Sequence, residues 1–256
     1  MSFKYTQKLP NYIEINQFIT SELKKSTNLL FVDTNINNFY NFLLQHVLKS
    51  ELLINKSYFI SSNKHLFYEK LYKYDDNFCE IYGTNLNHNM SLVFNLIKNH
   101  QDIRMLSNNK LNNYMIIIIL DNYIYKKSAW LKKFLSLGDK YNIKILIYSN
   151  YLPLVDTQIR NNLNMIMISN FIIDKYPFTC SYNKLKYLNE NYLTNFINTI
   201  ELRVLLKNIK DKQLLCITYD NNNYDKHYFI TLKENLQEED SDIDTDEFIE
   251  TFILEL

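Results

Sequence analysis

The sequence contains few of the residues that normally mark turns and the ends of helices and strands. Only two of its 256 residues are glycine, three are proline and one is alanine, while Asn, Lys, Ile, Tyr and Phe are abundant. This bias resembles the drift of an AT-rich genome. Local propensities are therefore weak guides here, because Asn stands at positions where other chains use Asp, Gly or Ser.

Cysteine is also scarce, and no long apolar segment is present. The cysteines Cys79, Cys180 and Cys216 are far apart and form no Cys-x-x-Cys pair, which argues against a disulfide framework and a zinc site. The five histidines are isolated from one another, so we expect no metal site from them. The longest apolar run, Met115 to Leu120, falls far short of the ~20 residues of a membrane span, and no secretory signal is present. We therefore expect an intracellular protein of a reducing compartment that contacts no membrane.

Charge is unevenly distributed, although the formal net charge is zero. Residues 234–256 contain ten acidic residues and no basic one, so the rest of the chain holds 18 of the 28 acids and all 28 bases. Most bases are lysines on expected helices, and lysine–phosphate contacts give sequence-independent, salt-sensitive binding to DNA. Two interpretations of the tail stay open: it competes with a polyanion such as DNA for the basic body, or it only keeps the protein soluble.

Apolar, β-branched runs predict a parallel sheet. Runs of this kind, bounded by polar residues, are typical of strands buried on both faces. The expected strands are 28–32, 57–60, 78–82, 115–120, 143–148 and 165–168. Asp121 directly follows one of them and would stand at the carboxyl edge of the sheet, where open α/β folds bind ligands. Otherwise it would only cap the segment that follows.

We expect a three-layer α/β domain over residues 27–233, with a mostly parallel central sheet and helices on both faces. Residues 1–26 form an N-terminal lead-in, and residues 234–256 form the acidic tail. Helical spacing is present from Phe39 onward and over 64–74, 90–97 and 185–205, and strands 214–219 and 227–232 predict a C-terminal hairpin.

The end of the tail has a pattern of its own. Phe248, Ile249, Phe252 and Leu256 would line one face of a short helix. This segment is either a docking peptide for a groove on the same chain or on a partner, or a frayed terminus.

The middle of the chain carries a more specific pattern. It contains, in order, Ile116-Ile-Ile-Ile-Leu-Asp-Asn122, Phe134-Leu-Ser-Leu-Gly-Asp-Lys-Tyr-Asn-Ile143, Ile147-Tyr-Ser-Asn-Tyr-Leu-Pro153 and Ile159-Arg-Asn-Asn-Leu-Asn164. Together these pieces resemble the genome-packaging ATPases of poxviruses and other large cytoplasmic DNA viruses, which belong to the FtsK–HerA-like class. The resemblance implies a P-loop NTPase fold, in which the first piece is the Walker B strand and the third ends in a polar sensor residue.

The resemblance breaks down at the nucleotide site. A P-loop uses two glycines, a Lys and a Ser or Thr to hold the phosphates and Mg²⁺. In register with these, Asp33 and Asn38 replace the glycines, Phe39 replaces the Lys and Tyr40 replaces the hydroxyl residue, with Thr34 inside the loop. The carboxylate of Asp33 would also repel the phosphates. We therefore expect neither ATP nor Mg²⁺ as a ligand.

The remaining site positions are only partly kept. Asp121 matches the first Walker B acid and is a residual candidate for holding a cation, whereas Asn122 replaces the acid that would act as general base. Asn150 stands at the sensor position. Arg160 matches the arginine of the last motif and is a candidate finger acting in trans, or else a member of a surface ion pair.

Three functions stay open. The first is a catalytically inactive relative of a packaging ATPase: a structural or regulatory subunit that binds DNA, forms a homo-oligomer or pairs with an active ATPase. The second is an α/β interaction module unrelated to packaging, because a fold does not fix a function. The third is ATP-dependent viral DNA packaging with an unorthodox nucleotide site, which would have to hold the phosphates without glycine or lysine. If the chain is viral, the host cytoplasm or the virion is its expected location.

Overall fold

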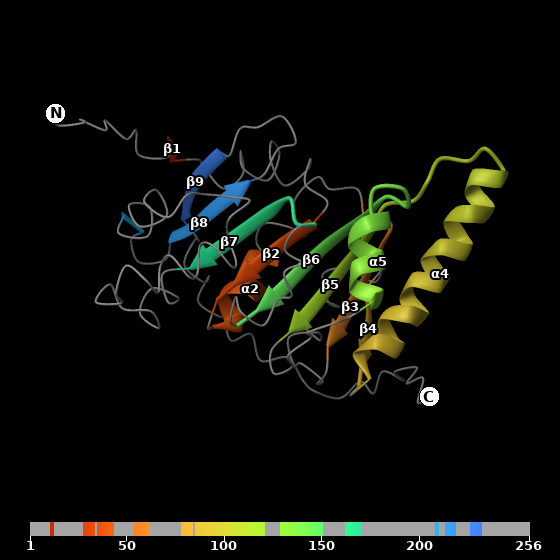
Figure 1. Ribbon diagram of the computed structural model, residues 1–256, viewed down its shortest axis with the longest axis horizontal. Helices are drawn as coiled ribbons and strands as arrows, with labels where there is room; N and C mark the ends of the chain where they lie inside the picture. The colour runs from red at the N-terminus through yellow and green to blue at the C-terminus, as the bar shows by residue number, and fades with distance from the viewer. Residues whose placement is uncertain are drawn as a thin grey trace, which may run out of the picture.

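One sheet runs through the whole described structure. The computed structural model describes residues 11–12, 28–33, 35–43, 54–61, 78–83, 85–120, 129–150, 162–169, 208–209, 213–218 and 226–231. Within these residues nine strands pair in the order β1-β9-β8-β7-β2-β6-β5-β3-β4 (Figure 1). They are β1 (Asn11–Tyr12), β2 (Asn28–Val32), β3 (Lys56–Ser61), β4 (Phe78–Tyr82), β5 (Tyr114–Leu120), β6 (Ile143–Ser149), β7 (Met165–Ser169), β8 (Gln213–Thr218) and β9 (Lys226–Thr231).

The sheet is mostly parallel. Six of the eight neighbouring pairs are parallel, and only β8 runs antiparallel, against both β7 and β9. β2 lies between β6 and β7, and β6 separates it from β5. The chain therefore does not simply add each strand beside the previous one, and the crossovers bring residues far apart in sequence to one edge of the sheet.

The central strands are buried on both faces because their apolar residues are continuous. All seven residues of β5 are buried. Ile116, Ile118 and Leu120 belong to one core cluster, whereas Met115, Ile117 and Ile119 belong to the other, as the alternation of side chains along a strand requires.

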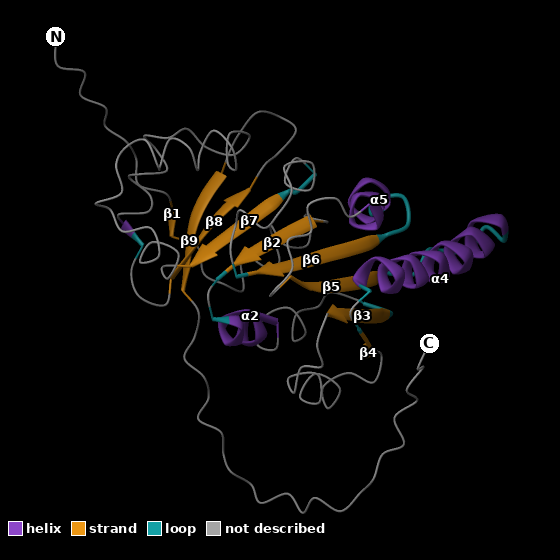
Figure 2. Ribbon diagram, turned by 60° about the horizontal axis from the view of Figure 1, so that its bottom comes forward, coloured by secondary structure: helices purple, strands orange, loops and turns teal. Residues whose placement is uncertain are grey.

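Helices cover both faces of the sheet. The described helices include α2 (Ile36–Phe42), α4 (Leu86–Leu106) and α5 (Ala129–Leu137). α4 and α5 pack in the cluster that contains Ile116, and α2 packs in the cluster that contains Ile117. Figure 2 shows α2 on one side of the strands and α4 with α5 on the other. This arrangement confirms the expected three-layer α/β fold.

Gly138 closes the connection from α5 to β6. The N–H of Ile143 donates to the carbonyl oxygen of Gly138 at 2.8 Å. A Cβ atom at Gly138 would come within 3.2 Å of the carbonyl oxygens of Phe134 and Ile143. A side chain would crowd the backbone there, so the tight turn uses one of the two glycines of the chain.

Most strand predictions are confirmed, with shifts of one residue at several ends. The expected C-terminal hairpin is formed by β8 and β9, and the helix expected over 90–97 is the centre of α4. β1, within the expected lead-in, adds an edge strand that the sequence did not indicate. The expected helices over 64–74 and 185–205 and the acidic tail lie outside the described residues. No helix in the described ranges is both long and apolar enough to cross a membrane.

Candidate functional site at the β2–α2 turn

Three central strands end together at the carboxyl edge of the sheet. Val32, at the end of β2, is in register with Ser149 of β6, and Ser149 is in register with Leu120 of β5. Asp33 and Asn150, which directly follow β2 and β6, therefore lie side by side at this edge. Ligands of open α/β folds bind at such an edge.

Asp33 organises the turn between β2 and α2. Its side chain is fully buried, and one carboxylate oxygen accepts the N–H of Asn35 at 2.9 Å. The other oxygen accepts the side-chain amide of Asn38 at 2.8 Å. Both carboxylate oxygens therefore have local donors, in the manner of an Asx turn that continues into the first turn of the helix.

The backbone of Asp33 is held by β6. Its N–H donates to the carbonyl oxygen of Ser149 at 3.2 Å, and its carbonyl oxygen accepts the hydroxyl of Tyr148 at 2.8 Å. Both backbone groups and both carboxylate oxygens of Asp33 thus have partners. Sequence reasoning missed Tyr148 and Ser149, because no local pattern marks a contact between residues 115 positions apart.

Asn35 caps α2 and sets where the helix begins. Its side-chain oxygen accepts the N–H of Asn37 at 3.0 Å, which is the usual N-cap contact. The helix starts at Ile36, although the sequence suggested a loop as far as Asn38. The expected loop is therefore too long: only residues 33–35 separate the strand from the helix. The signal was present, since Asn is a favoured N-cap residue, but it is masked by the many asparagines of this chain.

Phe39 and Tyr40 point into the core. Phe39 is fully buried, and its ring lies 5.3 Å from that of Phe31 and 5.3 Å from that of Tyr148. Tyr40 is 5% exposed, with its ring 6.3 Å from that of Phe39. These two side chains fasten α2 to the sheet and are not directed to the carboxyl edge.

The structure brings only part of the expected site together. Asp33, Asn38, Phe39 and Tyr40 form one unit, and half-buried Asn150 lies beside them, directly after the neighbouring strand β6. The other expected site residues, Thr34, Asp121, Asn122 and Arg160, lie outside the described residues. Among the residues that are described, no three His, Cys, Asp or Glu side chains gather as metal ligands.

A second polar cluster lies near the opposite edge of the sheet. His100 of α4 hydrogen-bonds the hydroxyl of Tyr114, and the Tyr114 ring stacks against Tyr58 at 6.4 Å. Burial raises the pKa of Tyr58 to about 12, and burial also raises the pKa of the Cys79 thiol. Both groups are therefore neutral at physiological pH, and the cluster reads as packing between α4 and the sheet rather than as a reactive site.

Comparison with known proteins rests on structure, because neither a protein-family model nor a curated protein sequence matches the chain. Three solved structures share its architecture. The pCW3 conjugation coupling protein TcpA aligns with a TM-score of 0.53 and 12% identity, over 83% of this chain and 62% of that one. ATPases 2 and 3 of EssC from Geobacillus thermodenitrificans align with a TM-score of 0.50 and 10% identity, over 82% and 40%. The genome-packaging NTPase B204 of Sulfolobus turreted icosahedral virus 2 aligns with a TM-score of 0.50 and 12% identity, over 78% and 95%.

The chain has the fold of these ATPases. The resemblance to the FtsK–HerA-like packaging ATPases is therefore confirmed at the level of the fold. The chain spans 62% of the TcpA structure, 40% of the EssC structure and 95% of the B204 structure.

In the register given by the sequence, the β2–α2 turn corresponds to the phosphate-binding loop. A P-loop places four residues between its two glycines, and backbone N–H groups of that loop surround the phosphates. Here the corresponding segment is shortened, since residues 36–38 already belong to α2. The carboxylate of Asp33 takes the donors of Asn35 and Asn38, so the anion at this helix terminus belongs to the protein itself.

Proposed function

We propose that the chain is a catalytically inactive relative of the DNA-packaging and DNA-translocating ATPases, and that it acts as a structural or regulatory subunit. The observation that carries the proposal is the hydrogen bonding of Asp33. Its buried carboxylate accepts from Asn35 and Asn38 at the place where a nucleotide phosphate would need donors. A triphosphate would have to displace this carboxylate and then lie beside its negative charge.

The residues at the lysine and hydroxyl positions support the same proposal. Phosphoryl transfer depends on cationic groups and Mg²⁺ placed around the transferred phosphate. Phe39 and Tyr40 supply neither, because both side chains are buried among aromatic rings on the face of α2. If either side chain turned toward a ligand, it would leave the core and open a gap there. The loss of the phosphate site is therefore coupled to the packing of α2.

A nucleotide titration tests this proposal on the full-length protein. Binding of a fluorescent ATP analogue is measured with and without Mg²⁺, using an active P-loop ATPase as the positive control. We expect no Mg²⁺-dependent binding tighter than about 1 mM, which corresponds to about −4 kcal/mol. Micromolar, Mg²⁺-dependent binding would instead favour an ATPase with an unorthodox site.

DNA is the partner that the charge of the described helices supports. The segments 85–113 and 129–142 contain six lysine or arginine residues and two acidic residues. Filter binding to duplex and single-stranded DNA over a range of salt concentrations tests this part. We expect binding that weakens steeply with salt and is indifferent to sequence. A protein that binds neither DNA nor nucleotide under these conditions would fit the alternative of an interaction module better.

A further inference from the structure

The outward face of α4 carries an apolar stripe. Leu96, Ile103 and Leu106 are 58%, 62% and 86% exposed, and half-buried Leu92 continues the line. Their spacing of four, seven and three residues, with Asn99 between, keeps them on one side of the helix. The residues that pack on the sheet, such as Met90 and Ile97, belong to the opposite side. Exposed apolar rows of this kind are typical of surfaces that another segment covers.

The C-terminal sequence offers a matching segment within the same chain. Ile249, Phe252, Ile253 and Leu256 recur at i, i+3, i+4 and i+7, which is the spacing of an amphipathic helix. Glu250 and Glu255 fall between them, Glu247 lies just before them, and no base occurs in the last 23 residues.

We propose that residues 248–256 dock as a short amphipathic helix along the outward stripe of α4, within the same molecule. Helices that bind another helix in this way use anchors at i, i+3, i+4 and i+7. Leu96 and Ile103, two turns apart, are the centre of the receiving surface. This inference does not depend on the nucleotide site, because it involves neither the β2–α2 turn nor a nucleotide. It uses the same basic layer as the proposed DNA binding.

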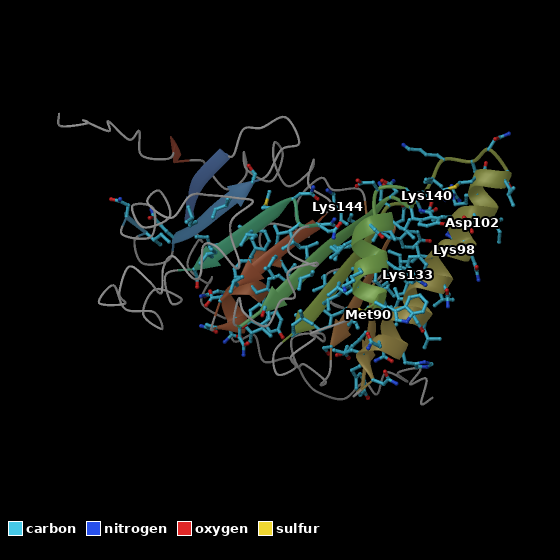
Figure 3. All side chains as sticks on the ribbon, viewed as in Figure 1. Met90, Lys98, Asp102, Lys133, Lys140 and Lys144 are labelled. Atoms are coloured by element: carbon cyan, nitrogen blue, oxygen red, sulfur yellow. The ribbon has the colours of Figure 1, made fainter. Side chains whose placement is uncertain are left out.

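Charge complementarity favours this occupant over a second copy of α4. The layer formed by α4 and α5 with their adjoining turns contains Lys98, Arg104, Lys110, Lys132, Lys133 and Lys140 against Asp102 and Asp139. Figure 3 shows Lys98, Lys133 and Lys140 on this side of the molecule. Lys98 and Asp102 pair with each other at 2.6 Å, so the remaining basic residues still give the layer an excess of positive charge. Two copies of a basic layer would repel, whereas the acidic tail is attracted to it.

The length of the chain allows docking within one molecule. β9 ends at Thr231 and lies six strand spacings from β3, which is about 29 Å. β9 points the same way as β7, and α4 begins just after the end of β4, so the tail leaves from the edge of the sheet at which α4 starts. The 17 residues from 232 to 248 span about 56 Å when extended, and a chain rich in like charges is extended.

Hydrogen exchange of the full-length protein, followed by mass spectrometry, tests the docking. A tether of this kind gives an effective concentration of about 1 mM. If the dissociation constant of the contact is about 100 μM, the tail is docked in roughly ten of every eleven molecules. We expect amides of 248–256 to exchange about tenfold more slowly in the wild type than in a Leu96→Ser, Ile103→Ser variant. A variant with Ile249→Ser and Phe252→Ser should lose the same protection.

The matched control keeps the stripe apolar. Leu96→Met with Ile103→Met should retain the slow exchange of 248–256, and exchange of the buried part of α4 should be unchanged in every variant. Equal exchange of 248–256 in the wild type and the Leu96→Ser, Ile103→Ser variant would overturn the proposal. So would protection that disappears on dilution from about 50 μM to about 1 μM, because the occupant would then be a second molecule.

Discussion

β5 and the turn after β2 lie close together in the same fold but depend on different kinds of residue. In β5 all seven side chains are buried and apolar, and a branched aliphatic residue of similar volume would serve at most of its positions. In the turn, the particular polar groups of Asp33 and Asn38 form the contacts. The sheet therefore tolerates drift in its sequence, whereas the turn depends on a few atoms.

The largest effect is expected when the lysine of the P-loop pattern is introduced into α2. Phe39→Lys places a cation in a fully buried aromatic cluster, so the free energy of unfolding should fall by at least about 4 kcal/mol. Urea denaturation of the full-length protein measures this loss. Phe39→Leu, which keeps the site apolar, should cost only about 1 kcal/mol. A stable Phe39→Lys protein that also binds Mg²⁺-ATP would contradict the view that α2 packing and a phosphate site exclude each other.

A smaller loss is expected from the turn itself. Asp33→Ala leaves the N–H of Asn35 and the amide of Asn38 without the carboxylate, so it should lower the free energy of unfolding by about 3 kcal/mol. Asp33→Asn keeps one acceptor oxygen and should cost about half as much. Both values come from denaturant titrations at pH 7. Equal stability of all three proteins would show that the hydrogen bonds of Asp33 contribute nothing net, and that the turn is held by packing alone.

The sheet offers the opposite test, because one of its polar residues, Lys144, should be replaceable by an apolar one. Burial lowers the pKa of Lys144 on β6 from 10.5 to about 8, although the charge of Asp139 opposes the shift. Below pH 8 the ammonium group of Lys144 is charged in both the folded and the unfolded protein. Burial of this charge in the folded protein then lowers the free energy of unfolding. Between pH 8 and 10.5 the unfolded chain binds more protons, so stability rises with pH, by an amount on the order of 2 kcal/mol.

Lys144→Met should therefore stabilise the protein at pH 7. The advantage over the wild type should shrink as the pH approaches 10.5, the usual pKa of an unburied lysine. The free energy of unfolding of both proteins is measured by denaturation at pH 7, 9 and 10.5. In the difference between the two proteins, the contributions of all other titrating groups cancel. A difference that does not change with pH would show that Lys144 has an ordinary pKa in the folded protein.

The sequence predicted the described strands well, because a continuous apolar run such as Ile116 to Leu120 leaves few alternatives to a buried strand. From Phe39 and Tyr40 at the P-loop positions it also predicted that no phosphate is bound, and this stays a prediction. It predicted the start of α2 poorly, since Asn35 resembles the many other asparagines until its contact with Asn37 is seen. It gave no indication of Tyr148 as the hydroxyl that holds Asp33.

By itself, the sequence determined which segments are buried on two faces. It also determined that residues 33–40 contain no glycine or lysine and that Tyr40, not Ser or Thr, stands at the last P-loop position. Only the tertiary structure decided that β2 lies between β6 and β7 and that the carboxylate of Asp33 accepts from Asn35 and Asn38. The physical reason is the range of the forces involved. Burial depends on the amount of apolar surface and can be read along the chain, whereas a hydrogen bond depends on distances and angles between groups that only the folded chain brings together.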